Sequence, residues 1–213
     1  MQKILDRVSN HLSNVGIALH AELNPKANAS DIESAQTHIG FSLPPDYVDF
    51  VTRFANGLSI SWASDDGPFA SFELESVGDS VGGALEMRDW RFYDDEAARE
   101  YGFPYTDDPK LALDTNRSMH NWIPLHAEGN GDNFSLNLNP DGYGNVVFDH
   151  HSWLDGGTGA NGFLMGTTLT SFLELWANVC FVQPRSLWWK SVLTESGVDW
   201  ASSEFDDRFR LTP

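Results

Sequence analysis

The chain has 213 residues, of which 41% are hydrophobic and 13% aromatic, a composition that is typical of a folded globular protein and argues against disorder. Its 31 acidic and 13 basic residues give a net charge of −18. Because a field of this sign repels phosphate backbones and anionic lipid headgroups, the composition argues against direct binding to nucleic acid or membranes.

Apolar residues at helical spacing predict two helices at the start of the chain. The first begins near the N-terminus and ends before residue 14. In the second, Ser30 and Glu33 have the form of a capping box, in which the serine hydroxyl and the glutamate carboxylate satisfy backbone amides at a helix start. Gly40 supplies the stop of this second helix.

Two prolines open the third predicted helix. Pro44 and Pro45 are tolerated in a first helical turn, and the carboxylate of Asp46 is favourable at the positive end of the helix dipole. The pair Asn56-Gly57 ends this helix. Alternating apolar residues in 58–62 then predict a strand.

The stretch from residue 61 to residue 110 is the acidic part of the chain. It holds thirteen acidic and four basic residues, which is half of the net charge of the whole sequence. Several aromatic residues accompany these charges, so we expect a folded acidic face rather than a linker. We predict that eight of its acids contact a partner: Asp65, Asp66, Glu73, Glu75, Asp79, Asp94, Asp95 and Glu96.

The second half of the sequence is richer in strand patterns. Strict alternation in 134–138 predicts one strand, and 146–148 is typical of the returning strand of a hairpin. Residues 169–181 show helical spacing. The last segment carries three tryptophans and is expected to dock on the rest of the chain.

Several of these features resemble the SUKH superfamily of Smi/Knr-type domains. The capped helix at 29–33, the turn at 40–47 and the Asn56-Gly57 stop follow the order of the family signature, and Trp122-Ile123-Pro124 looks like part of its second half. We expect the residues that carry the motif to be mostly architectural. They are Leu43, Pro44, Tyr47, Phe50, Asn56, Gly57, Trp122 and Pro124.

The resemblance implies an α+β fold in which one domain contains a twisted antiparallel sheet with helices packed against it. We therefore expect a SUKH-like domain at residues 1–181 and an aromatic-rich C-terminal extension, residues 182–213, packed on it. The resemblance also implies a protein-binding module without enzymatic activity. Many bacterial members of the family are immunity proteins that bind and neutralise a cognate toxin, often a nuclease, whereas other members are regulatory or scaffold proteins.

The charge favours the immunity alternative. A toxin that grips nucleic acid presents a basic cleft, and an acidic protein can occupy such a cleft. The predicted partner is therefore a basic toxin domain. The alternative explanation of the net negative charge is that it serves only solubility. The sequence does not indicate whether the chain forms oligomers.

One sequence motif points to an enzyme. Residues 78–82 match the G-x-S-x-G pattern of a nucleophile elbow, with Ser80 as the nucleophile, which leaves a serine hydrolase as a remote alternative. That elbow belongs to a large parallel sheet with several strands before it, whereas the first 57 residues predict helices. We therefore predict no enzymatic activity and no catalytic residue.

Acidic and histidine residues in the second half do not have the spacing of ligand sites. Asp149–His151 are consecutive, and adjacent side chains on a strand point to opposite sides, so local hydrogen bonding explains them better than a metal. Glu128, Asn130 and Asp132 alternate like calcium ligands but lack the downstream bidentate glutamate, so a hairpin turn explains them better. The glycine-rich run 156–162 lacks the Lys-Ser/Thr of a phosphate-binding loop. We predict no metal and no cofactor.

The cysteine content and the N-terminus predict a cytoplasmic protein. Cys180 is the single cysteine, so no intrachain disulfide is possible. The N-terminal residues alternate apolar with charged side chains and contain no apolar signal region, and no later stretch approaches membrane-spanning length.

Overall fold

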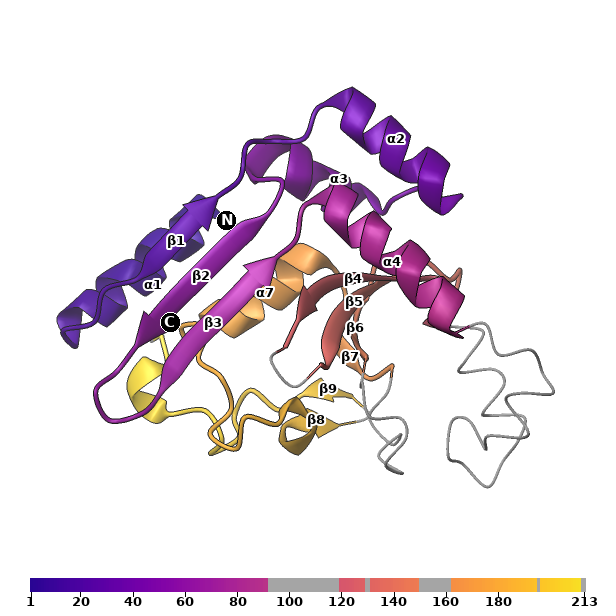
Figure 1. Cartoon of the computed structure of the whole chain (residues 1–213). Helices are drawn as coiled ribbons and strands as arrows, with labels where there is room; N and C mark the ends of the chain where they lie inside the picture. Colours follow the sequence, from indigo (N-terminus) through magenta and orange to yellow (C-terminus); the bar gives the residue numbers. More distant parts are fainter. Residues whose placement is uncertain (92–118, 129–130, 150–161, 195, 212–213) are drawn as a thin grey trace, which may run out of the picture.

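The computed structural model describes residues 1–91, 119–128, 131–149, 162–194 and 196–211 (Figure 1). The elements of the first part are α1 (Gln2–Asn14), β1 (His20–Leu23), α2 (Ala29–Ile39), α3 (Pro45–Asp49), a π-helical turn (Phe50–Phe54), β2 (Leu58–Ala63), β3 (Phe69–Leu74) and α4 (Val77–Arg91). Those of the second part are β4 (Trp122–Ala127), β5 (Asn133–Asn137), β6 (Val146–Asp149), β7 (Leu164–Gly166), α7 (Leu169–Ala177), β8 (Leu193–Thr194) and β9 (Gly197–Val198), with short 3-10 helices at Trp189–Ser191 and Asp207–Phe209.

Every strand pair among the described residues is antiparallel. The strands form the sheets β1-β2-β3, β4-β5-β6-β7 and β8-β9. The first two sheets meet after β3, where the Glu75 N–H donates to the Leu125 carbonyl at 3.0 Å. The predicted hairpin is confirmed, with Leu136 of β5 opposite Val146 of β6. The predicted α+β class is confirmed as well.

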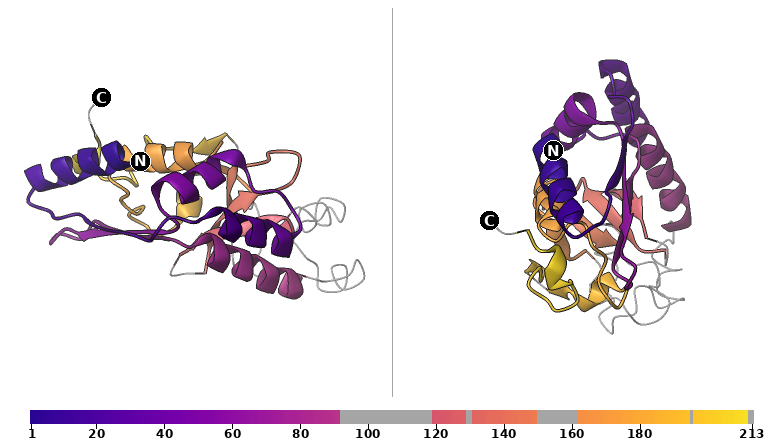
Figure 2. Two further views of the ribbon diagram at one scale, coloured as in Figure 1. Left: turned by 90° about the horizontal axis from the view of Figure 1, so that it is seen from above. Right: turned by 90° about the vertical axis from the view of Figure 1, so that its left-hand side faces the viewer.

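The β1-β2-β3 sheet has one covered face and one open face. Buried side chains such as Ile60, Trp62 and Phe72 alternate with exposed ones along β2 and β3. Seen from above in Figure 2, α1 and α7 lie together on one side of this sheet. The opposite row of the strands, which includes Ser61 and Glu73, faces solvent. The alternation in the sequence thus sets which residues of this sheet are exposed.

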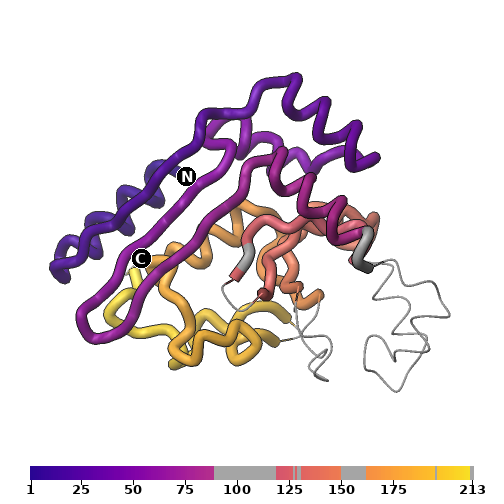
Figure 3. Tube along the Cα trace, in the orientation of Figure 1, coloured from indigo at the N-terminus to yellow at the C-terminus, as the bar shows by residue number. Residues whose placement is uncertain are grey.

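An aromatic cluster forms the centre of the core around Trp176 of α7. The rings of Phe72 and Trp189 both lie 5.0 Å from the Trp176 ring, centroid to centroid. Trp189 comes from the C-terminal segment, and Phe209 from the same segment packs 4.5 Å from Trp62. Figure 3 shows this last segment, in yellow, passing beside the turn between β2 and β3. Aromatic residues of the C-terminal segment are therefore part of the main core.

The cap of α2 differs from the predicted one. Asn28, not Ser30, is the capping residue: its Oδ1 accepts from the backbone N–H groups of Ser30 and Asp31 at 2.8 and 3.1 Å. The Asp31 carboxylate in turn accepts from the Asn28 N–H at 2.8 Å. The prediction of a capping box was right in kind but wrong by two residues, because asparagine and aspartate form the same reciprocal pair.

The last predicted helix is shorter than its spacing suggested. α7 ends at Ala177 instead of Phe181, because Cys180 and Phe181 adopt φ values of 53° and 59° in the left-handed region. Both residues are fully buried in this turn, and the Cys180 carbonyl accepts from the Trp62 indole at 2.7 Å. Burial raises the pKa of the Cys180 thiol to about 12, so the thiol stays protonated.

None of the described helices has the length and apolar character needed to cross a membrane.

Candidate functional site: an acidic cluster beside a helical groove

Three of the predicted contact acids come together where β3 leads into α4. Glu73 points to solvent from the open face of β3, Glu75 follows the end of the strand, and Asp79 lies in the first turn of α4. The Asp79 carboxylate accepts from the Ser76 hydroxyl at 2.5 Å, which fixes its position at the helix start. We call Glu73, Glu75 and Asp79 the acidic cluster.

The carboxylates of the acidic cluster repel one another. Partial burial raises the pKa of Glu75, and the nearby charges of Asp79 and Glu73 raise it further, while His126 opposes them. No lysine or arginine pairs with these three acids among the residues that the structure describes. A cation brought by another molecule would relieve this repulsion.

Asp65 and Asp66 lie apart from the acidic cluster, in the turn between β2 and β3. Asp66 forms an ion pair with Arg208 at 2.6 Å and accepts from the Ser64 hydroxyl. These two contacts, that of Ser64 foremost, lower the pKa of Asp66. The ion pair with Arg208 neutralises the charge of Asp66 and holds the C-terminal segment to the β2-β3 turn. Asp65 is exposed beside it.

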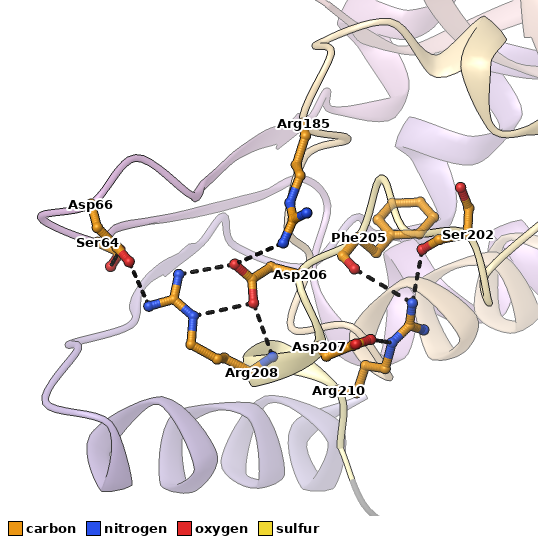
Figure 4. Close-up of polar contacts among 9 residues, drawn as sticks. All are labelled: Ser64, Asp66, Arg185, Ser202, Phe205, Asp206, Asp207, Arg208 and Arg210. Atoms are coloured by element: carbon orange, nitrogen blue, oxygen red, sulfur yellow. Dashed lines mark hydrogen bonds and ion pairs between the residues drawn. The ribbon is translucent and has the colours of Figure 1, made fainter.

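Arg208 also forms an ion pair with a second acid, Asp206, as Figure 4 shows. The Asp206 carboxylate accepts from Arg208 at 2.9 Å and lies 3.4 Å from the Arg185 guanidinium. Hydrogen bonding to Arg208 lowers the pKa of Asp206 to about 2. The remaining predicted acids, Asp94, Asp95 and Glu96, lie outside the described residues.

Two further acids near the cluster were not in the predicted set. Glu22 of β1 lies on the same outward row as Glu73, since both pair with Ser59 in the register of the sheet. Two strand spacings, about 10 Å, separate Glu22 from Glu73. Asp31 of α2 lines a pocket together with Gly78 of α4. Only the pairing of strands and helices brings these residues close, so their positions along the chain gave no signal.

The pocket that contains Asp31 is a groove between α2 and α4, the two helices at the upper right of Figure 1. It has a volume of about 450 Å³. Asn56 helps to place α4 beside α2, because its Oδ1 accepts from the Val77 N–H at the first residue of α4, at 2.8 Å. We call this pocket the α2–α4 groove. Asp79 of the acidic cluster does not line the groove but borders it, because its carboxylate accepts from the hydroxyl of Ser76, a lining residue.

The residues that carry the family motif are largely interior. The buried ones are Leu43, Pro44, Tyr47, Phe50, Gly57, Trp122 and Pro124. Gly57 has a φ of 116°, a backbone conformation that favours glycine, and a Cβ there would also displace the Asn24 side chain, whose nitrogen would lie 2.4 Å away. Asn56 is half-buried and makes the bond to α4 described above. The positions are thus occupied by residues that fill the core or connect elements.

Ser80 does not have the geometry of a nucleophile elbow. It lies in the first turn of α4 with 0% of its surface exposed, and it faces the buried hydroxyl of Tyr47. A nucleophile elbow instead presents its serine at an exposed, strained turn between strand and helix. The burial of Ser80 closes the access that a substrate would need.

The polar residues of the second half form interior contacts. Glu128 accepts from the Trp189 indole at 3.0 Å and lies 3.2 Å from His126 Nε2, so its carboxylate points into the interior. His126 Nδ1 lies 2.9 Å from the Glu73 carbonyl. Asp132 and Asp149 are buried, and residues 150–161 lie outside the described part. No group of three potential metal ligands occurs in the part of the chain that the structure describes.

Comparison with known proteins places most of these elements in one family model. The model of the SMI1 / KNR4 family (SUKH-1) matches residues 26–175. This range contains the acidic cluster, both helices of the groove and all but two residues of α7. No curated protein matches the chain.

Proposed function

The chain belongs to the SMI1 / KNR4 family (SUKH-1), and on that premise we propose that it is an immunity protein that binds and neutralises a basic, nuclease-like toxin. Its role is binding, without catalysis. The acidic cluster is the contact that attracts the toxin. We place the encounter in the cytoplasm, in keeping with a single cysteine that is buried.

The observation that carries this proposal is the placement of Glu73, Glu75 and Asp79. Three like charges within a few residues, one of them partly desolvated, oppose folding and are best explained by a partner that supplies the opposite charge. The net charge of −18 adds a long-range field that accelerates encounter with a basic surface. A nuclease needs such a basic surface to bind the phosphate backbone of its nucleic-acid substrate.

Co-expression with the polypeptide encoded by the neighbouring reading frame tests the proposal. We expect this polypeptide to stop growth when produced alone and to be harmless when the present chain accompanies it. The two should also migrate as one complex in size-exclusion chromatography. Growth arrest that persists in the presence of the chain would rule out the immunity role. A stable complex with a harmless partner would favour the regulatory or scaffold role instead.

A further inference from the structure

We propose that the α2–α4 groove receives a segment of the partner, with an apolar side chain seated between the two helices and a lysine or arginine beside Asp31 and Asp79. The inference rests on the proposed function, because it takes the partner to be a basic protein. It adds the place where the partner is anchored and the chemistry of the segment that enters.

The groove is formed by matching faces of two helices. Residues spaced by three or four positions lie on one face of a helix, and each helix contributes such a set. The set from α2 is Asp31, Ser34, Ala35 and His38, and the set from α4 is Gly78, Val81, Gly82 and Leu85. Ala35 and Val81 are buried, whereas Ser34 and Gly82 are exposed. The groove therefore has a buried apolar floor and an exposed rim.

Gly82 is a residue that the fold itself does not require. It lies inside α4, its φ is not in the left-handed region, and a Cβ built there would meet no atom within 4 Å. Glycine inside a helix is destabilising relative to alanine. The neighbouring Gly83 differs, because a Cβ there would lie 3.2 Å from Pro124. Close approach of another chain to the backbone of α4 explains why glycine occupies position 82.

The charges at the two ends of the groove give the bound segment a direction. Asp31 and Asp79 lie in the first turns of α2 and α4, at one end of the groove. At the other end the Arg88 guanidinium donates to the Ile39 carbonyl at 3.0 Å. The entering segment therefore places its cation at the acidic end. A second copy of this chain, which carries the same charge of −18, is a poor occupant for that end.

A substitution that fills the groove can test binding independently of folding. We expect Gly82→Leu to weaken the affinity for the neighbouring polypeptide by about tenfold or more, because the new side chain occupies the site of the partner's anchor. The midpoint of thermal unfolding should stay the same or rise, since a glycine has left a helix. Asn10→Leu adds the same side chain on the exposed face of α1 and should leave the affinity unchanged.

Titration calorimetry and thermal unfolding of the full chain decide the matter. If Gly82→Leu binds with wild-type affinity, the groove is not the binding site. The same conclusion holds if both Gly82→Leu and Gly82→Ala lose affinity and also unfold at a lower midpoint, because the loss then comes from a damaged fold. If the acids of the cluster are needed for binding while Gly82→Leu binds normally, the proposed function stands and only the groove is wrong. If the neighbouring polypeptide does not bind the wild-type chain at all, the proposed function falls and the groove with it.

Discussion

The carboxylate of Glu75 is partly buried next to two other acids, and its pKa is raised above the ordinary value. Between the ordinary pKa and the raised one, the folded chain binds more protons than the unfolded chain does. The free energy of unfolding therefore falls as the pH rises through this window, which begins near pH 4.5. At neutral pH the charge on Glu75 thus destabilises the fold, as is common for groups kept for function.

Replacing this charge should stabilise the protein. We expect Glu75→Gln to raise the free energy of unfolding at pH 7 by up to about 1 kcal/mol, a limit that allows for solvent screening of the exposed part of the side chain. The gain should shrink as the pH falls toward 4. Urea denaturation between pH 4 and pH 8 measures both effects. Glu174→Gln, on the exposed face of α7, is the control. A stability of Glu75→Gln at or below that of the wild type at pH 7 would contradict this account.

At the scale of elements, local signals predicted more than tertiary ones. The helix that follows Pro44, the Asn56-Gly57 stop and the β5-β6 hairpin were predicted because proline, glycine and alternation act through neighbouring residues. The acidic cluster was predicted in part, because its three members lie within seven residues of one another. The partners of Asp66 and Glu128 were not predicted, since Arg208 and Trp189 lie far along the chain.

The start of α2 offers a direct test at this scale. Asn28→Ala removes the acceptor of two backbone N–H groups and should lower the free energy of unfolding by about 1 kcal/mol. Ser30→Ala should change it by less than about 0.5 kcal/mol, because the structure gives the hydroxyl no role in the cap. Chemical denaturation of both variants measures the difference. A larger loss of stability in Ser30→Ala than in Asn28→Ala would contradict this result and support the serine cap that the sequence alone suggested.

The C-terminal segment shows how one element can depend on distant ones. Trp189 sits among the core rings, and Asp66 and Arg208 hold the segment to the β2-β3 turn. The family match ends at residue 175, before this segment begins. We propose that residues 182–213 are an aromatic-rich extension packed on a SUKH-like domain at 1–181.

Across the whole molecule, the acids fall into groups with different surroundings. Those near the C-terminal segment, such as Asp66 and Asp206, are paired with arginines and hold the structure together. Those of the acidic cluster have no such cation among the described residues. Glu73 and Asp79 are exposed, and Glu75 is partly buried. On the proposed function, we therefore expect the placement of the acids to matter more for recognition than their number. Neutralising equal numbers at two places should have unequal effects.

The association rate with the neighbouring polypeptide, measured by stopped flow at low and high salt, tests this most directly. The triple variant Glu73→Gln, Glu75→Gln, Asp79→Asn should associate about tenfold more slowly at low salt and depend less on salt, whereas Asp6→Asn, Asp141→Asn, Glu174→Gln, which loses the same charge from exposed sites elsewhere, should change the rate by less than about twofold. Equal rates for the two triple variants would contradict the account, because they would show that the acidic cluster has no special part in attracting the partner.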